Sequence, residues 1–272
     1  MSIRKFTLTN SKGTTWSFNG RSTIKSFMQN PEGLGFSSSL NVIRYGEKAN
    51  LDSQSFDLPR VKAEIVFWDV KNANRYKTYN DFLAFIMNTP LVLTYQLPLS
   101  TPADYKLDCY VLNISKSETG SNDCINCDVE FQGLSFWQGA QVLQTGSSSS
   151  YTINNKGDCP VGFEIAITGS MENPYFTLVQ DGEMYGECKF DDATAFGDVF
   201  VNSKDGEHNV ILKQGGSALA NPLAYQDLSI SNGAIYVTFL KLARGESTLT
   251  IGMDSGSIGG VTISHTPIYR SI

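Results

Sequence analysis

The sequence predicts an all-β protein of two domains, with one short helix in the first. Residues 105–137 hold two runs that alternate apolar and polar residues around a polar turn, which is typical of a hairpin with one buried face. Asp-Gly and Asn-Gly turns divide the second half into short apolar segments, as in a β-sandwich. The chain has 24 Gly, 16 Phe and 12 Tyr among 272 residues and is 18% charged, which favours strands over helices.

The domain boundary is predicted at residues 138–150, QGAQVLQTGSSSS. Four serines after Thr-Gly cannot pack into a core, so this stretch indicates a linker or an exposed loop. We therefore expect domains at residues 1–140 and 141–272 with separate cores. All three tryptophans precede the boundary: Trp16, Trp68 and Trp137.

In the first domain, residues 5–8 and 15–18 are expected to pair across a turn at residues 10–13. Gly33-Leu34-Gly35, after Pro31, indicates a loop. Residues 61–68 and the two runs within 105–137 are the remaining strands.

The short helix is expected to begin at Asn80, a good N-cap, and to end before Pro90, with Asn88 near its C-cap. About two turns, or about 12 Å, are too short to be stable alone, so the helix must lie on a sheet. We interpret the apolar face of this helix as part of the hydrophobic core and not as a ligand-binding site. That face comprises Phe82, Leu83, Phe85 and Ile86.

The second domain shows no comparable helix. Turns are expected at residues 181–182, 204–206, 215–216, 232–233 and 244–245. The strands expected between them are residues 161–168, 175–180, 184–190, 199–202, 209–213, 235–240, 248–251 and 260–264.

The charge is unevenly distributed between the two halves. Residues 1–140 hold 14 Lys and Arg against 13 Asp and Glu, and residues 141–272 hold 7 against 14, so the net charges are +1 and −7. The acidic half is not a nucleic-acid binder, because phosphate contacts need a basic surface. Because the first half is nearly neutral, like-charge repulsion opposes its packing beside copies of itself only weakly.

No transmembrane span or secretory signal is expected, because the apolar runs are short and the first residues lack an apolar core. The protein is therefore expected to be made in a cytoplasm and to stay soluble, with reduced thiols. Cys124 and Cys127 form a C-x-x-C whose alternation places them on opposite strand faces. Strand cysteines are favoured over a zinc or redox site. The other three cysteines are Cys109, Cys159 and Cys188.

No catalytic motif, cofactor site or metal site is predicted. His208 lies beside a turn and His265 near the expected end of a strand, so neither is expected to be a buried imidazole. An acidic region could hold calcium, but a solvated face is favoured. It contains Asp181, Glu183, Asp191, Asp192 and Asp198. Tyrosines and a phenylalanine are sugar-stacking candidates by type only, with packing favoured: Tyr175, Tyr185, Phe196, Tyr225 and Tyr236.

The order of three segments resembles distal tail proteins (Dit) of long-tailed, siphovirus-type phages. The first is Leu8-Thr9-Asn10-Ser11-Lys12-Gly13 followed by 31–36, the second is 75–86 running into 91–95, and the third is 105–137 ending in Phe136-Trp137. The resemblance covers residues 1–140 well and the second half loosely, at Asn173-Pro174 and 242–246.

The resemblance implies a ring-forming N-terminal β-sandwich or split barrel, and a C-terminal β-sandwich similar to galectins or carbohydrate-binding modules. It implies a homohexameric ring in the virion, at the distal end of the tail. The implied partners are the tail tube protein, the tape-measure protein, and tail-tip, tail-lysin or receptor-binding proteins. Two alternatives remain at this point: a carbohydrate-binding adhesion module that recognises a host-surface saccharide, and a sandwich-type hydrolase, which has no positive feature in the sequence.

Overall fold

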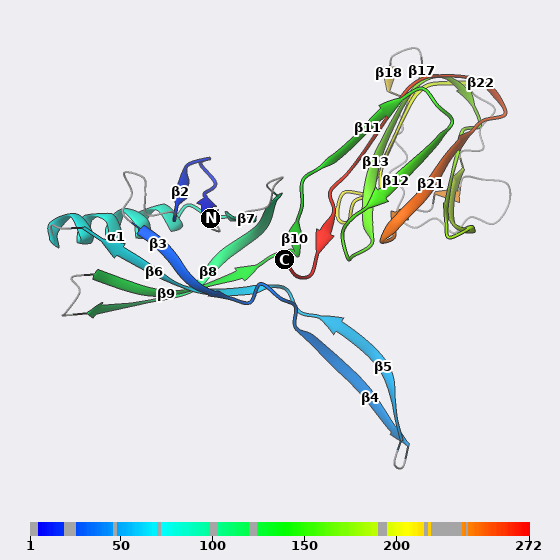
Figure 1. Ribbon diagram of the computed structural model, residues 1–272. Helices are drawn as coiled ribbons and strands as arrows, with labels where there is room; N and C mark the ends of the chain where they lie inside the picture. Colours follow the sequence, from blue (N-terminus) through cyan, green and yellow to red (C-terminus); the bar gives the residue numbers. More distant parts are fainter. Residues whose placement is uncertain are drawn as a thin grey trace. The chain divides into compact units, whose positions relative to one another are not determined.

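The computed structural model describes residues 5–18, 26–45, 48–69, 72–97, 103–119, 124–189, 195–214, 217–218, 236–237 and 239–272. The chain forms two compact units (Figure 1). Unit 1 comprises Met1–Ala140 together with Tyr269–Ile272, and unit 2 comprises Gln141–Ile268. The last four residues therefore lie with the first unit, whereas a single cut at residue 140 would assign them to the second.

Unit 1 is built on one nine-stranded sheet. The order along its main path is β2-β1-β7-β8-β9-β6-β3. Two short strands, β10 (Trp137–Gln138) and β23 (Ile268–Tyr269), pair beside this path. The main strands are β1 (Lys5–Thr9), β2 (Thr15–Ser17), β3 (Ser26–Glu32), β6 (Arg60–Trp68), β7 (Leu91–Leu97), β8 (Ala103–Thr119) and β9 (Cys124–Gly133).

The sheet is curled but open, since its path ends at β2 on one side and β3 on the other. A side-chain hydrogen bond joins these edge strands: Trp16 Nε1 donates to Ser26 Oγ over 3.0 Å, and both residues are buried. The curl encloses the core of unit 1, which includes Phe6, Leu8, Ile65, Phe67, Leu93, Leu107, Cys127, Phe131 and Trp137. The predicted hairpin at residues 5–18 and the strand pair within 105–137 are both confirmed.

The helix α1 (Asn72–Ile86) is 15 residues long, so the predicted start at Asn80 is wrong. Its first turns lack an apolar stripe, and other contacts hold them. Arg75 is buried, Tyr79 packs edge-on against Phe67 with centroids 5.8 Å apart, and Lys116 Nζ lies 4.6 Å from the Tyr76 ring centroid. These are aromatic and cation–π contacts from the sheet, which the local sequence does not reveal.

The helix ends at Ile86, and Asn88 stabilises this end as predicted: its Nδ2 donates to Ala84 O over 2.9 Å. Phe82, Phe85 and Ile86 are buried, as expected for a face that lies on the sheet. Asn10 ties the first hairpin to the helix. Its Oδ1 accepts the backbone N–H groups of Lys12 and Thr14, and its Nδ2 donates to Phe85 O.

Unit 2 is a β-sandwich of two sheets. The seven-stranded sheet has the order β11-β22-β13-β16-β17-β18, with β20 beside β13, and the five-stranded sheet has the order β12-β21-β14-β15-β19. The strands are β11 (Val142–Gly146), β12 (Ser150–Asn155), β13 (Val161–Glu172), β14 (Tyr175–Gln180), β15 (Glu183–Lys189), β16 (Ala195–Asn202), β17 (Asn209–Gln214), β18 (Ser217–Ala218), β19 (Tyr236–Val237), β20 (Lys241–Leu242), β21 (Gly245–Gly252) and β22 (Ser255–His265).

Residues from both sheets form one core, including Ile165, Val201 and Ile263 from one and Phe176, Leu178 and Leu249 from the other. Most predicted strands of this unit are present. Of residues 235–240, only β19 is a described strand, and the turns at 215–216 and 232–233 lie outside the described residues. The supposed linker is in part a strand, because β11 pairs with β22. The side chains of β11 are largely exposed, so its sequence lacks the alternation of apolar and polar residues that marks a half-buried strand.

In the described part of the chain, no helix is long and apolar enough to cross a bilayer.

Candidate assembly interface

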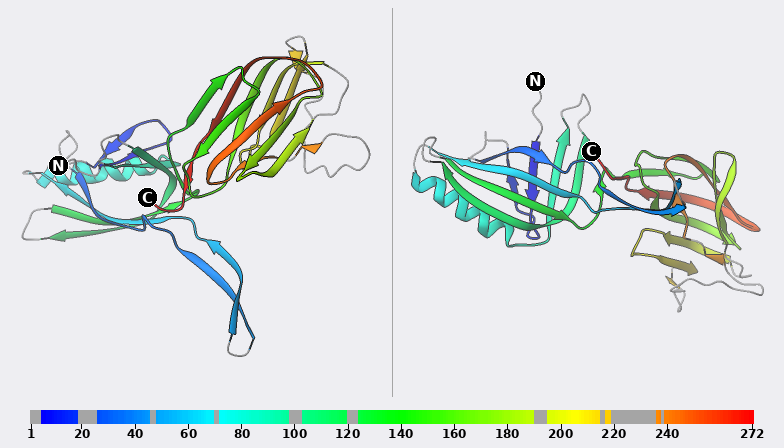
Figure 2. Two further views of the ribbon diagram at one scale, coloured as in Figure 1. Left: turned by 45° about the vertical axis from the view of Figure 1, so that its right-hand side comes forward. Right: turned by 90° about the horizontal axis from the view of Figure 1, so that it is seen from below.

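A β-hairpin of unit 1 stands apart from the curled sheet. Among the described strands, β4 (Ser38–Tyr45) and β5 (Lys48–Phe56) pair only with each other, as a separate two-stranded sheet. We call residues 38–56 the arm. Figures 1 and 2 show it running away from the sheet of its own unit. The sequence reasoning did not predict these strands.

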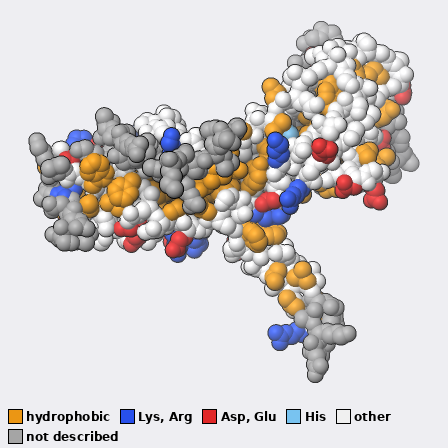
Figure 3. Space-filling view, in the orientation of Figure 1, with side chains coloured by type: hydrophobic (Ala, Val, Ile, Leu, Met, Phe, Trp, Pro, Cys, Tyr) orange, Lys and Arg blue, Asp and Glu red, His pale blue; other side chains and the backbone are white. Residues whose placement is uncertain are grey.

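The arm exposes four aliphatic side chains: Leu40, Val42, Ile43 and Leu51. Leu40 and Leu51 are 58% and 59% exposed, and Val42 pairs directly opposite Leu51. Figure 3 shows hydrophobic side chains along this segment. An isolated two-stranded hairpin is marginally stable in water, and exposed apolar side chains on a free strand edge favour association. The arm is therefore a candidate interaction surface.

The base of the arm is fixed firmly. Ser37 Oγ donates to Asp57 Oδ2 over 2.7 Å, and the Asp57 N–H donates to Ser37 O. The Phe36 and Phe56 rings meet edge-on, 5.6 Å between centroids. The C-terminal tail adds a contact, because the Arg270 guanidinium lies 4.0 Å from the Phe56 ring centroid. The C-terminal tail therefore packs against the base of the arm.

Two grooves follow each other along strand β6: one at the base of the arm, at the start of β6, and one farther along the sheet. The base groove, of about 790 Å³, includes the exposed side chains of Phe36 and Leu58, then Pro59 and Arg60. The sheet groove, of about 450 Å³, is polar. Its charged lining residues are Glu32, Lys62, Glu64, Asp128 and Glu130.

The charges in the sheet groove are only partly compensated. Glu130 Oε1 lies 3.4 Å from Arg60 Nε and 3.8 Å from Lys62 Nζ. Glu64 stands directly opposite Asp128 in the β6–β9 ladder, and like charges in that position destabilise a sheet. Their hydrogen-bond donors are neutral: Gln29 Nε2 for Glu64 and Ser115 Oγ for Asp128. This end of the groove is therefore suited to a basic side chain.

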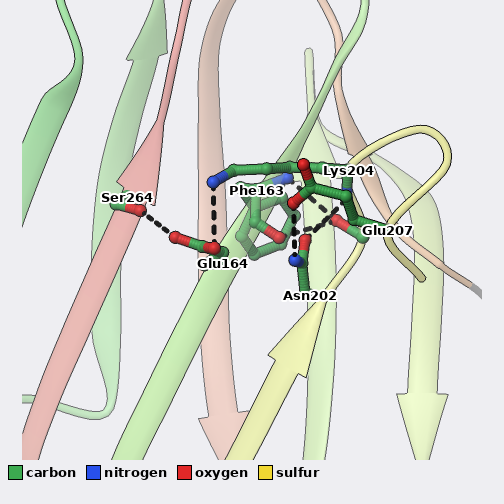
Figure 4. Close-up of polar contacts among 7 residues, drawn as sticks. Phe163, Glu164, Asn202, Lys204, Glu207 and Ser264 are labelled. Atoms are coloured by element: carbon green, nitrogen blue, oxygen red, sulfur yellow. Dashed lines mark hydrogen bonds and ion pairs between the residues drawn. The ribbon is translucent and has the colours of Figure 1, made fainter. Parts of the chain in front are cut away.

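Unit 2 carries a polar cluster at one end of its seven-stranded sheet (Figure 4). Lys204 Nζ lies 2.9 Å from Glu164 Oε1, and Ser264 Oγ donates to Glu164 Oε2 over 2.7 Å. Burial raises the pKa of Glu164, but the hydrogen bonds from Lys204 and Ser264 outweigh burial, so its pKa is lowered. An ionised carboxylate with both oxygens bonded is suited to holding strands together and not to donating a proton.

The acidic residues considered for calcium do not all lie in one region. Asp181 and Glu183 lie together at the β14–β15 turn of one sheet, whereas Asp198 lies on β16 of the other sheet. The idea of one acidic region is therefore wrong for Asp198, and Asp191 and Asp192 lie outside the described residues.

Among the sugar-stacking candidates, Tyr185 is exposed and Tyr175 is half-buried. Tyr175 packs over Gly252, where an added Cβ would lie 2.0 Å from its ring. The side chains of Phe196 and Tyr236, and all of Tyr225, lie outside the described residues.

His265 is 1% exposed, so the expectation that neither histidine is buried is wrong for it. The alternation that buries the strand of residues 260–264 extends through residue 265. His208 is exposed as expected and stacks on Phe239, with ring centroids 4.2 Å apart. In the parts of the chain that the structure describes, no three His, Cys, Asp or Glu residues come together as a metal site requires.

None of the five cysteines forms a disulfide bond. Cys127 is buried with Ile125 and Val129, whereas Cys124 is half-buried on the other face of β9, as the alternation predicted. Burial raises the pKa of Cys109, Cys127 and Cys188 to about 12. These thiols are therefore poor nucleophiles in the folded protein.

We expect one thiol per chain, that of Cys124, to react quickly with a disulfide reagent at pH 8, because the other four are buried. All five should react after denaturation, and Cys124→Ser should remove the fast phase. Elemental analysis of protein purified without chelators should find well under one zinc per chain. Stoichiometric zinc that is lost together with stability in Cys124→Ser would contradict this expectation.

The chain is similar to known phage proteins in sequence and fold. Residues 5–134 match the family model for the N-terminal domain of distal tail proteins. No curated protein sequence matches the chain significantly. The solved structure of SPP1 Dit, described as a paradigm of the hub adsorption apparatus in phages that infect Gram-positive hosts, matches with a TM-score of 0.68 and 13% identity. This match covers 96% of this chain and 98% of that one.

A chain of the phage P2 baseplate in its activated conformation with Ca has a TM-score of 0.55 and 13% identity, and the match covers 99% of this chain and 100% of that one. The corresponding structure with Sr gives 0.51 and 14%, with 97% and 98% covered. These similarities extend the shared fold over both units. Residues 5–134 therefore match the N-terminal domain of distal tail (Dit) proteins, and both units share the fold of SPP1 Dit.

Proposed function

We propose that this chain is the subunit of a homohexameric ring at the distal end of a phage tail. In this role the ring joins the tail tube to the tail-tip or receptor-binding apparatus in the virion, after assembly in the host cytoplasm. The protein is architectural and not catalytic. Its other expected partners are the tail tube and tape-measure proteins.

The arm is the observation that carries this proposal. It presents aliphatic side chains to solvent and pairs with no other strand that the structure describes, so it gains stability when another surface covers it. The low net charge of residues 1–140 supports contacts between copies through unit 1. The match of residues 5–134 to distal tail proteins supports the place in the tail, as does the fold shared with SPP1 Dit and with a chain of the phage P2 baseplate.

The proposal predicts that the full chain forms hexamers of about 180 kDa, six copies of 29.9 kDa. We expect sedimentation velocity to show a monomer–hexamer equilibrium that shifts to the hexamer with concentration, and negative-stain images to show closed rings. The full chain is the appropriate material, because Tyr269 and Ile272 pack on the core of unit 1 and a fragment ending at residue 140 would lack them. Monomers alone up to millimolar protein would contradict the ring.

A further inference from the structure

We infer that the arm of one copy docks along strand β6 of the next copy, with its aliphatic side chains in the base groove and Arg44 in the sheet groove beside Glu64 and Asp128. This inference rests on the proposed ring and names the two surfaces that meet in it. The arm and the two grooves all belong to unit 1, so the arm that docks in the grooves of one chain comes from a second copy.

The arm cannot fill the base groove of its own chain. It leaves the unit at Ser37 and Asp57, which themselves line that groove, and it runs away from the sheet (Figure 2). Its aliphatic side chains therefore remain exposed within one chain, as do Phe36 and Leu58 in the groove. Two different surfaces of one chain that bind each other make a head-to-tail contact, and such a contact closes into a ring when its rotation permits.

The order of chemistry along the two surfaces matches. On the arm, aliphatic Leu40 is followed four residues later by Arg44, which is exposed and makes no ion pair with any described residue. Along β6, Arg60 at the base groove is followed four residues later by Glu64 at the sheet groove. Four residues of strand span about 13 Å. The aliphatic side chains of the arm can therefore reach the base groove while Arg44 reaches the acidic end of the sheet groove.

The electrostatics of the sheet groove favour this occupant. Glu64 and Asp128 face each other with neutral donors only, whereas Glu130 already has Arg60 and Lys62 nearby. A guanidinium placed between the two opposed carboxylates would relieve their repulsion and donate hydrogen bonds to both from one planar group. Arg44 is the basic residue of the arm whose side chain the structure describes.

A charge exchange tests the contact in the full chain. Arg44→Glu should weaken association by about tenfold or more in sedimentation velocity, because it brings a third carboxylate to the acidic end. Glu64→Arg should weaken it similarly, and the double variant should return to within about threefold of wild type. Lys12→Glu is the matched control. It makes the same charge change on the exposed turn after β1, outside both surfaces, and should leave association unchanged.

Cross-linking gives a second, independent measurement in a Cys124→Ser background. A mixture of chains carrying Leu40→Cys with chains carrying Leu58→Cys should form a disulfide-linked dimer on mild oxidation, whereas neither variant alone should do so. Wild-type hexamers with no mixed disulfide, and no loss of association in Arg44→Glu, would overturn the docking inference while leaving the ring intact. Wild-type protein that stays monomeric would instead overturn the ring itself, and the docking with it.

Discussion

Replacing Phe82 by alanine is expected to lower the free energy of unfolding of unit 1 by about 3–5 kcal/mol. The side chain is fully buried where the helix lies on the sheet. Its ring centroid lies 5.2 Å from that of Trp16, 5.4 Å from Phe67 and 6.0 Å from Phe18. Truncation removes the group that fills the space between the helix and both β2 and β6. The surrounding rings are too rigid to collapse fully into the cavity.

Denaturant unfolding followed by tryptophan fluorescence measures this loss selectively, because Trp16, Trp68 and Trp137 all belong to unit 1. The transition of unit 2 should be followed separately, since a two-unit chain need not unfold in one step. Met87→Ala is the matched control just after the same helix: Met87 is exposed, so its loss should change stability by less than about 0.5 kcal/mol. A loss below about 1 kcal/mol for Phe82→Ala would mean that the helix does not close this core.

The sequence predicted the parts of the fold in which burial alternates along the chain. The strands of residues 61–68 and 161–168 have one face in a core, and their apolar residues recur with a period of two. The turn at Asp181-Gly182 was also predictable, because both residues adopt positive φ, which Asp tolerates and Gly favours.

The arm could not be predicted in the same way. It has no buried face within the chain, so its aliphatic residues follow neither the strand nor the helix period. The first half of the helix was missed for a related reason. Arg75 is buried, and Tyr79 contacts Phe67 of β6 and Lys116 of β8, which are distant in sequence. Local propensity carries no record of such contacts. The segments that lack a clear strand or helix period include the arm, whose aliphatic side chains are proposed to be covered by another copy and not by their own chain.

The candidate interface was foreseen only as a property of the first half, from its low net charge and its resemblance to distal tail proteins. Its residues were not foreseen. Glu64 and Asp128 are separated by 63 other residues and meet only through the β6–β9 register. A basic residue in an unassigned segment, Arg44, gave no signal of its own. Surfaces formed by pairing register and by a projecting hairpin require the tertiary structure.

Unit 2 should lose stability as the pH falls below about 6.5 because of His265. The residue is 1% exposed, and its Nε2 has no hydrogen-bond partner among the described residues. Burial lowers the pKa of His265, partly offset by its hydrogen bond to the backbone of Asn154. The pKa in the folded state is therefore below the value of about 6.5 expected in the unfolded chain. The unfolded state binds the proton more readily, so acid favours unfolding.

The stability that depends on neutral His265 is fully present above about pH 6.5 and is lost as the pH falls from there through the folded-state pKa. The free energy of unfolding then changes by at most about 1.4 kcal/mol per pH unit. Unfolding of unit 2, followed by hydrogen exchange of its strands at several pH values, should show this slope in wild type. His265→Gln should remove it whatever its own effect on stability, because glutamine does not titrate. His208→Gln should keep it, since His208 is exposed. Parallel curves for wild type and His265→Gln between pH 7 and pH 5 would show that a proton on His265 is tolerated in the folded sandwich.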